Sequence, residues 1–194
     1  RTALATAESE EARLQLLEGY LLNPDARSTT PALRSTMLTG QTAGVRLKAF
    51  CVARDLAKRE GREALIAVLK EGVGNPYQEV RRESIRACRD NPSYELVGEL
   101  MAIVRQGGTD RSVAIPALAF TAAPEAQKLV LDTAKSEEVA RADRIQAIAL
   151  LSRTDLEEGI TYLQELATGE DPELQRYAME SRAIWQERKK ADGR

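Results

Sequence analysis

The sequence contains no histidine, few aromatic residues and no long apolar run, and each of these absences narrows its range of functions. Without histidine, the chain lacks the commonest general base and the commonest metal ligand, so Ser-His and Cys-His nucleophile pairs cannot form. Aromatic residues make up 4% of the 194 residues, which disfavours a β-sandwich or a β-barrel. No apolar run reaches the roughly 18 residues that span a bilayer. These absences favour a helical protein without a histidine-based active site.

Cysteine is also scarce, because Cys51 and Cys88 are the only two. Both fall inside expected helices among apolar neighbours, and free cysteine is often buried, so we expect two reduced thiols in the core. A disulfide between neighbouring helices is the alternative, and it depends on a Cβ separation that the sequence leaves open. Two isolated cysteines cannot supply the four ligands of a structural zinc site.

The charge of the chain is nearly balanced, with 28 Lys and Arg against 30 Asp and Glu and a formal net charge of −2. Nothing in this balance attracts a polyanion, so nucleic acid is not the expected partner. Acidic pairs such as Glu157-Glu158 fall near expected helix starts, where carboxylates interact favourably with the helix dipole. We therefore expect no catalytic residue, no bound metal and no cofactor.

The chain begins at Arg1 and not at methionine, which predicts a processed form or a segment excised from a longer protein. A targeting signal in a missing leading segment would not be visible here. The sequence therefore leaves the compartment open, with the cytoplasm slightly favoured over the periplasm or secretion.

A short unit recurs along the chain: an apolar residue, often followed by Arg, with a small residue four positions after the start. Its copies begin at Val45, Val80, Val113, Asp143 and Leu174, which are separated by 35, 33, 30 and 31 positions. A second apolar unit lies between these copies, and two of its instances, 64–72 and 99–107, match at length. Two interleaved series with a period near 33 predict a two-helix module that is stacked several times.

The spacing of apolar residues indicates helices and not strands. Val45, Ala49 and Leu56 recur with the 3.6-residue period of a helix, and no strand-like alternation is sustained. Proline is expected at first helical positions and glycine at helix ends, namely Pro31, Pro124, Pro172, Gly61, Gly72, Gly107 and Gly169. The expected helices span about 8–22, 31–39, 43–60, 62–73, 77–90, 94–106, 111–122, 125–135, 139–153, 157–168 and 172–190.

The pattern Val-Arg-x-x-Ala at the start of a second helix, as in Val45 to Ala49 and Val80 to Ser84, resembles the HEAT repeat. The resemblance covers about 45–187 and implies an all-α fold, a right-handed α-α superhelix of about four to five helix pairs. Two copies depart from the pattern, because Val113 is followed by Ala and the next copy begins with Asp143. The tetratricopeptide repeat is disfavoured because its Trp, Gly-Tyr and Pro positions are not found at a 34-residue spacing. An irregular helical bundle is the remaining alternative.

The period divides the chain into three parts. Residues 43–187 form the expected HEAT-like repeat array. Residues 1–42 break the period and are predicted to be an N-terminal helical cap or an irregular first repeat, as terminal repeats often are. Residues 188–194 are polar and are predicted to be a tail that frays.

Arginines crowd the expected second helices of the first two repeats. In HEAT-like solenoids these helices line the concave face, so stacking would place Arg46 beside Arg81 and make a positive row. The candidate partner-binding residues are Arg46, Arg54, Arg81, Arg82, Arg86 and Arg89. Two other readings stay open. Acidic residues such as Glu79 and Glu83 neutralise the row through local pairs, or arginine at the motif position bonds to acidic or backbone groups of the adjacent turn.

The expected helix at 111–122 has no charged residue after Arg111. A helix that is apolar all round is usually buried on two sides or contacts a partner. We expect burial in the middle of the array, and a partly exposed apolar groove for a partner peptide is the alternative.

An extended helical stack offers a long surface without a deep pocket, and a basic row suits an acidic or amphipathic segment. We therefore expect a non-catalytic scaffold that binds a protein or peptide on its concave face. The resemblance also admits two alternatives. One is a nucleic-acid-binding protein similar to the HEAT-like DNA alkylation repair proteins, whose positive face carries aromatic residues; here Trp185 is expected to anchor the core instead. The other is a protein that resembles the phycobilin lyases and binds a tetrapyrrole.

Overall fold

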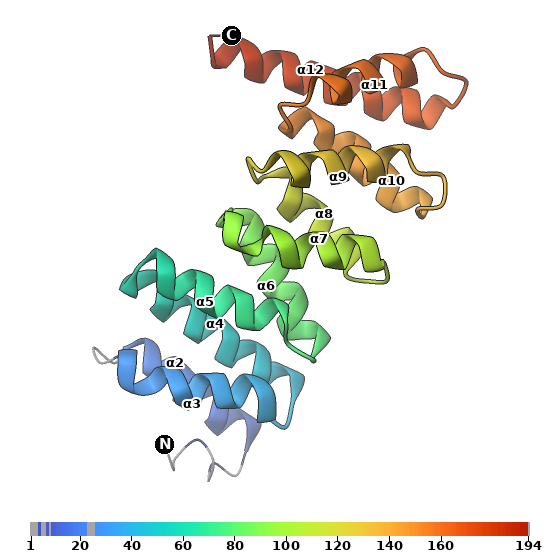
Figure 1. The fold of residues 1–194 in the computed structure, drawn as a ribbon. Coiled ribbons are helices and arrows are strands. Elements are labelled where there is room, and N and C mark those ends of the chain that lie inside the picture. The colour runs from blue at the N-terminus through green and yellow to red at the C-terminus, as the bar shows by residue number, and fades with distance from the viewer. Residues whose placement is uncertain (1–3, 5–6, 8, 23–25, 194) are drawn as a thin grey trace. The chain divides into compact units, whose positions relative to one another are not determined.

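The computed structural model describes residues 4, 7, 9–22 and 26–193, and within them the chain is helical without any strand, which confirms the all-α prediction (Figure 1). The α-helices are α2 (Glu10–Leu21), α3 (Ala26–Thr39), α4 (Ala43–Glu60), α5 (Arg62–Val73), α6 (Gln78–Asp90), α7 (Val97–Gln106), α8 (Arg111–Ala119), α9 (Pro124–Lys135), α10 (Arg141–Leu150), α11 (Glu157–Ala167) and α12 (Pro172–Ala191). Two short 3-10 helices, η1 (Tyr94–Leu96) and η2 (Leu151–Arg153), precede α7 and follow α10.

The chain divides into two compact units, Arg1–Cys88 and Arg89–Arg194, with the boundary inside α6. In the first unit α4 packs against α2, α3 and α5. In the second unit α7 pairs with α8, α9 with α10 and α11 with α12, while α8, α10 and α12 contact one another in turn. Stacked helix pairs of this kind are the modules of a helical-repeat solenoid.

Hydrogen bonds between residues about one repeat apart hold neighbouring modules together. In the first unit the Arg46 Nε donates to Glu79 at 2.7 Å, across 33 residues. In the second unit the Ser181 hydroxyl, 1% exposed, lies within 2.9 Å of the Ile148 carbonyl oxygen, again 33 residues away. The sequence predicted that residues about 33 apart lie in equivalent, adjacent helices, and these bonds confirm that prediction within each unit.

The ion pair that Arg141 of α10 forms at the start of α12 also changes the pKa of Asp171. Arg141 donates to Asp171 at 2.7 Å and to Glu173 at 2.9 Å. The hydrogen bond from Arg141, followed by one from the backbone N–H of Leu174, lowers the pKa of Asp171 below its ordinary value of 3.8. A carboxyl group whose pKa is lower in the folded chain contributes stability above its unfolded pKa, and that contribution is lost as the pH falls through the folded pKa.

We therefore expect Arg141→Gln to raise the pKa of Asp171 towards 3.8. Titration of the side-chain carboxyl by NMR measures this midpoint directly. Glu158 serves as the internal control, because its lowered pKa comes first from a hydrogen bond with Lys128 and should not move. An unchanged Asp171 midpoint in the variant would show that Arg141 is not what lowers it.

The apolar helix expected at 111–122 is α8, and it ends three residues earlier than predicted, at Ala119. Ala114, Ile115 and Leu118 are fully buried, because α8 packs against α7, α9 and α10. The prediction that this helix is buried is therefore confirmed, and the alternative of an open groove does not hold for the helix itself. Phe120, the residue that follows it, remains 43% exposed.

Two helix-boundary predictions are wrong. Pro31 was expected at the first position of a helix, but α3 begins at Ala26, so Pro31 lies inside it. Proline in a helix interior leaves one carbonyl without its usual partner, yet its fixed φ remains compatible with the helix. Gly72 was expected to end a helix, but it is a buried residue inside α5. Gly61 and Gly107 do terminate α4 and α7 with positive φ values of 127° and 80°, as predicted.

The two cysteines were expected to be reduced thiols in the core. Cys51 and Cys88 form no disulfide in the described part of the chain; Cys88 is buried and Cys51 is half-buried. Burial raises the pKa of the Cys51 thiol.

Arg188 and Lys189 were assigned to a fraying tail, but α12 continues to Ala191 and both side chains bond to Asp155 at 3.0 Å. None of the described helices is both long enough and apolar enough to cross a membrane.

Candidate partner-binding surface

Arg46 makes several structural contacts within the first unit. Its Nε donates to Glu79 at 2.7 Å, and its Nη1 donates to the Gly40 carbonyl at 2.8 Å. Its guanidinium lies 3.8 Å from the centre of the Tyr77 ring. Only 13% of the side chain is exposed. Arg46 therefore joins α4 to the start of α6 and offers little surface to a partner.

Arg81 occupies the equivalent place one repeat later. Its Nη1 donates to the carbonyl of Asn75 at 2.9 Å, six residues earlier, as Arg46 does to Gly40. In both repeats the guanidinium therefore donates a hydrogen bond to a backbone carbonyl of the turn that precedes its helix. This is the structural role that the sequence left open for arginine at the motif position.

Arg54 and Arg86 share one carboxylate. Arg54 donates to Asp55 at 3.0 Å and to Glu83 at 3.4 Å, and Arg86 donates to the other oxygen of Glu83 at 3.3 Å. The Arg54 side chain is 20% exposed, whereas that of Arg86 is 54% exposed. Local acidic residues therefore reduce the positive charge of the row, and Arg86 is the member best placed to meet a partner.

The remaining two candidates lie on α6. Arg82 is half-buried. Arg89 is 50% exposed, pairs with its neighbour Asp90 at 3.0 Å and belongs to the second unit. Within the first unit, the structure brings together Arg46, Arg54, Arg81, Arg82 and Arg86 on the adjacent helices α4 and α6.

The two units differ in charge. Residues 1–88 contain 14 Lys and Arg against 11 Asp and Glu, a net charge of +3, whereas residues 89–194 contain 14 against 19, a net charge of −5. The net charge of −2 for the whole chain does not reveal this difference between the two units. An acidic segment is therefore attracted to the first unit and repelled on average by the second.

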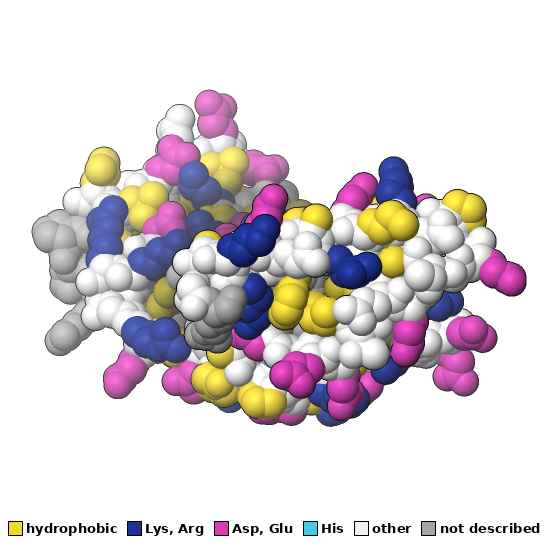
Figure 2. All heavy atoms as spheres, turned by 90° about the horizontal axis from the view of Figure 1, so that it is seen from above, with side chains coloured by type: hydrophobic (Ala, Val, Ile, Leu, Met, Phe, Trp, Pro, Cys, Tyr) yellow, Lys and Arg dark blue, Asp and Glu magenta, His cyan; other side chains and the backbone are white. Residues whose placement is uncertain are grey.

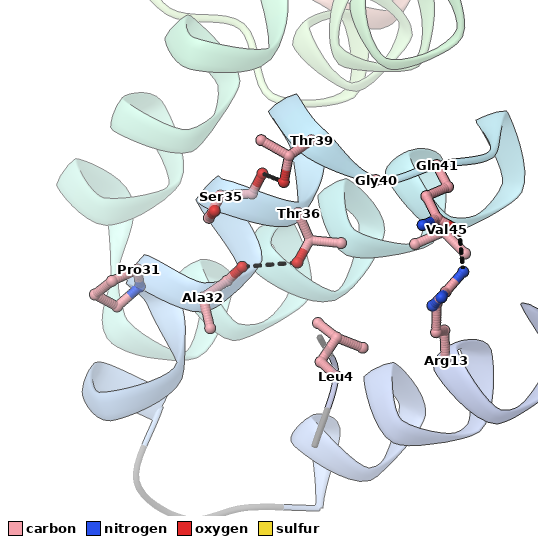
Figure 3. A pocket seen from close by; sticks show the side chains of 10 residues that line it. All are labelled: Leu4, Arg13, Pro31, Ala32, Ser35, Thr36, Thr39, Gly40, Gln41 and Val45. Atoms are coloured by element: carbon pink, nitrogen blue, oxygen red, sulfur yellow. Dashed lines mark hydrogen bonds between the residues drawn. The ribbon is translucent and has the colours of Figure 1, made fainter. Parts of the chain in front are cut away.

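A hollow of about 410 Å³ lies between α2, α3 and the start of α4 (Figure 3). Its polar side chains are largely occupied: Arg13 donates to Gln41 at 2.7 Å, and the hydroxyls of Thr36 and Thr39 donate to carbonyls of their own helix. Each of these three side chains is therefore held by at least one hydrogen bond within the first unit. Across the described part of the chain, no three Cys, Asp or Glu residues gather in a way that could hold a metal ion.

Comparison with known proteins identifies no family for this chain. No family model matches the chain, and no curated protein matches it. Among solved structures, a designed armadillo repeat protein is similar with a TM-score of 0.46 and 16% identity over 94% of this chain and 97% of the other. An engineered protein is similar with a TM-score of 0.48 and 16% identity over 95% and 96%. The helix pairs and the bonds between residues about 33 apart make the chain an all-α helical-repeat protein, and the HEAT family itself stays a resemblance.

Proposed function

We propose that this chain is a non-catalytic interaction scaffold that binds an acidic segment of a protein partner at α4 and α6 of the first unit. The observation that carries the proposal is the net charge of +3 on this unit, together with the half-exposed Arg86 at the surface of α6. Electrostatic complementarity of this kind guides association and selects partners of opposite charge.

Arg46 and Arg81 are half-buried and have a structural role at this surface. Arg46 and Arg81 are engaged with carbonyls and, for Arg46, with Glu79, so they fix the α6 helix in place. Arg86 is held at 3.3 Å from Glu83 and remains half-exposed. A partner carboxylate would compete with Glu83 for this guanidinium, which makes binding weak, reversible and sensitive to salt.

Charge reversal tests the proposal with a defined probe, a fluorescein-labelled amphipathic peptide with Glu on one face and Leu on the other. We expect Arg86→Glu to weaken its binding about fivefold to tenfold at low salt, since the substitution turns an attraction into a repulsion. Fluorescence anisotropy measures the Kd, and circular dichroism establishes that the variant keeps its helices.

Arg62→Glu is the matched control, because Arg62 is an exposed residue of the same unit and the same charge change is made at the first residue of α5. We expect it to change the Kd less than about twofold. Equal losses in both variants would replace a defined site by diffuse charge attraction, and no loss in either would remove the arginine surface. Duplex DNA binding more tightly than the peptide would favour the nucleic-acid alternative.

A further inference from the structure

The second unit has a hollow of about 770 Å³ where the start of α11 faces the C-terminal half of α12. Its two walls carry opposite charges. Asp155 and Glu157 line the wall that leads into α11, and Lys189 and Lys190 line the wall formed by α12. Ile160 of α11 and Trp185 of α12 are the apolar part of the lining. Figure 2, which views the α11–α12 end of the second unit, shows basic and acidic side chains interspersed with hydrophobic ones.

The walls are fixed by a single arginine. Arg188 donates to the carbonyls of Arg153 at 2.7 Å and Thr154 at 2.6 Å, and to Asp155 at 3.0 Å. Lys189 adds a bond to the same Asp155 oxygen at 3.0 Å. The C-terminal half of α12 is therefore anchored against the turn before α11, and the hollow exists before any ligand arrives. Such preorganisation reduces the entropic cost of binding.

Three groups of the lining lack partners within the described residues. The indole Nε1 of Trp185 is buried without a hydrogen-bond acceptor. Glu157 and Lys190, one on each wall, are exposed and form no ion pair with any described residue. A buried donor without an acceptor is costly in a native protein and calls for a partner. The Lys189 ammonium lies 5.7 Å from the centre of the indole ring.

We infer that this hollow binds a short peptide segment of a partner protein in which an apolar residue lies between one acidic and one basic residue. The apolar side chain contacts Trp185 and Ile160. The acidic residue meets Lys190, the basic residue meets Glu157, and a peptide carbonyl accepts the Trp185 N–H. A volume of about 770 Å³ lies within the range of sites that bind ligands of several residues or of drug size.

The charges of the walls favour this occupant over simpler ones. An anion alone would be attracted by Lys190 but repelled by Glu157, whereas Asp155 is already paired with Arg188 and Lys189. A purely apolar ligand would leave both of the exposed charges and the indole donor unmatched. The site lies in the second unit, so it does not depend on the arginine surface of the first, and either proposal can fail alone.

Trp185 is the only tryptophan and reports directly on its own surroundings. Capped pentapeptides are the probes: Gly-Glu-Leu-Lys-Gly, its reverse Gly-Lys-Leu-Glu-Gly, and a neutral Gly-Gln-Leu-Gln-Gly. We expect a saturable change in indole fluorescence with the charged peptides, with one order preferred and the neutral peptide bound about fivefold more weakly. No saturable change up to about 1 mM would overturn the inference.

Charge-swapped variants give the sharper result. Lys190→Glu and Glu157→Lys alone should each weaken binding of the preferred peptide about fivefold, and the double variant should prefer the reverse order. Met179→Ala, at an exposed position on the same helix outside the hollow, should leave the Kd unchanged. An equal loss in Met179→Ala, or an unaltered preference in the double variant, would contradict the inference. Free leucine binding as tightly as the peptides would replace it with a small-molecule site.

Discussion

Gly72→Ala is expected to lower the free energy of unfolding of the first unit by about 2 kcal/mol, because the close packing of α5 leaves no room for a methyl group. A Cβ at Gly72 would lie 2.7 Å from the Ser84 Cβ and 2.8 Å from the Phe50 Cε2. Both neighbours are fully buried. Displacing Ser84 also disturbs its 2.7 Å hydrogen bond to the Leu69 carbonyl, so the clash outweighs the helix propensity that alanine gains, about 1 kcal/mol.

Gly19→Ala provides the matched control, because Gly19 is also inside a helix of the first unit but has nothing within 4 Å of its added Cβ. We expect it to stabilise the unit by up to about 1 kcal/mol. Urea unfolding followed by circular dichroism measures both changes. Stabilisation by both substitutions would mean that α5 and α6 separate easily, and the close approach would lose its structural importance.

Arg46→Ala is expected to lower the free energy of unfolding of the first unit by about 2 kcal/mol. The substitution removes charge-assisted hydrogen bonds to Glu79 and Gly40 and the stacking on Tyr77, and the side chain is only 13% exposed. It also leaves Glu79 without its guanidinium partner. Thermal and urea unfolding monitored by circular dichroism measure the loss.

Arg86→Ala, by contrast, should change the stability by less than about 0.5 kcal/mol, since its pair with Glu83 is largely exposed. The two substitutions therefore separate structure from recognition: Arg46 should matter for folding and Arg86 for peptide binding. If Arg46→Ala were as stable as the wild type yet lost peptide binding, the assignment of Arg46 to structure would be wrong.

The hydrogen bond between Arg46 and Glu79 should make this stabilisation depend on pH. Partial burial alone would raise the pKa of Glu79, but a backbone hydrogen bond and the guanidiniums of Arg46 and Arg81 lower it below its ordinary value of 4.5. The stabilisation is thus complete above about pH 4.5 and is lost as the pH falls through the lower folded pKa. The stability difference between Arg46→Ala and the wild type should shrink in that acidic range.

The repeat period in the sequence was sufficient to predict the helix pairs. Arg46 and Arg81 were predicted to occupy equivalent positions, and each donates to a carbonyl six residues before it. The same spacing did not reveal which arginines reach solvent. That outcome depends on Glu79 and Glu83 of α6, whose side chains accept from Arg46 and Arg54 only after α4 and α6 pack together.

The errors have a common physical origin in contacts between helices. Gly72 follows an apolar run, so its local sequence is typical of a helix end, but the requirement for a glycine comes from Phe50 and Ser84 on two other helices. The hollow beside Trp185 combines residues 155–160 with residues 185–190, and no motif joins those two segments. Trp185 itself was expected to be a core anchor, whereas it is half-buried at the edge of that hollow.

The bonds between modules also determine how the chain can fold. The side-chain hydrogen bonds from Arg59 to Leu21 and from Asn75 to Met37 each span 38 residues of sequence, which is close to one repeat. The entropy lost on closing a loop grows only slowly with its length, and loops near this size recur along the whole chain. Low contact order of this kind is associated with folding in microseconds to milliseconds. Each module can therefore form on its predecessor as soon as about forty residues are available, without waiting for the rest of the chain.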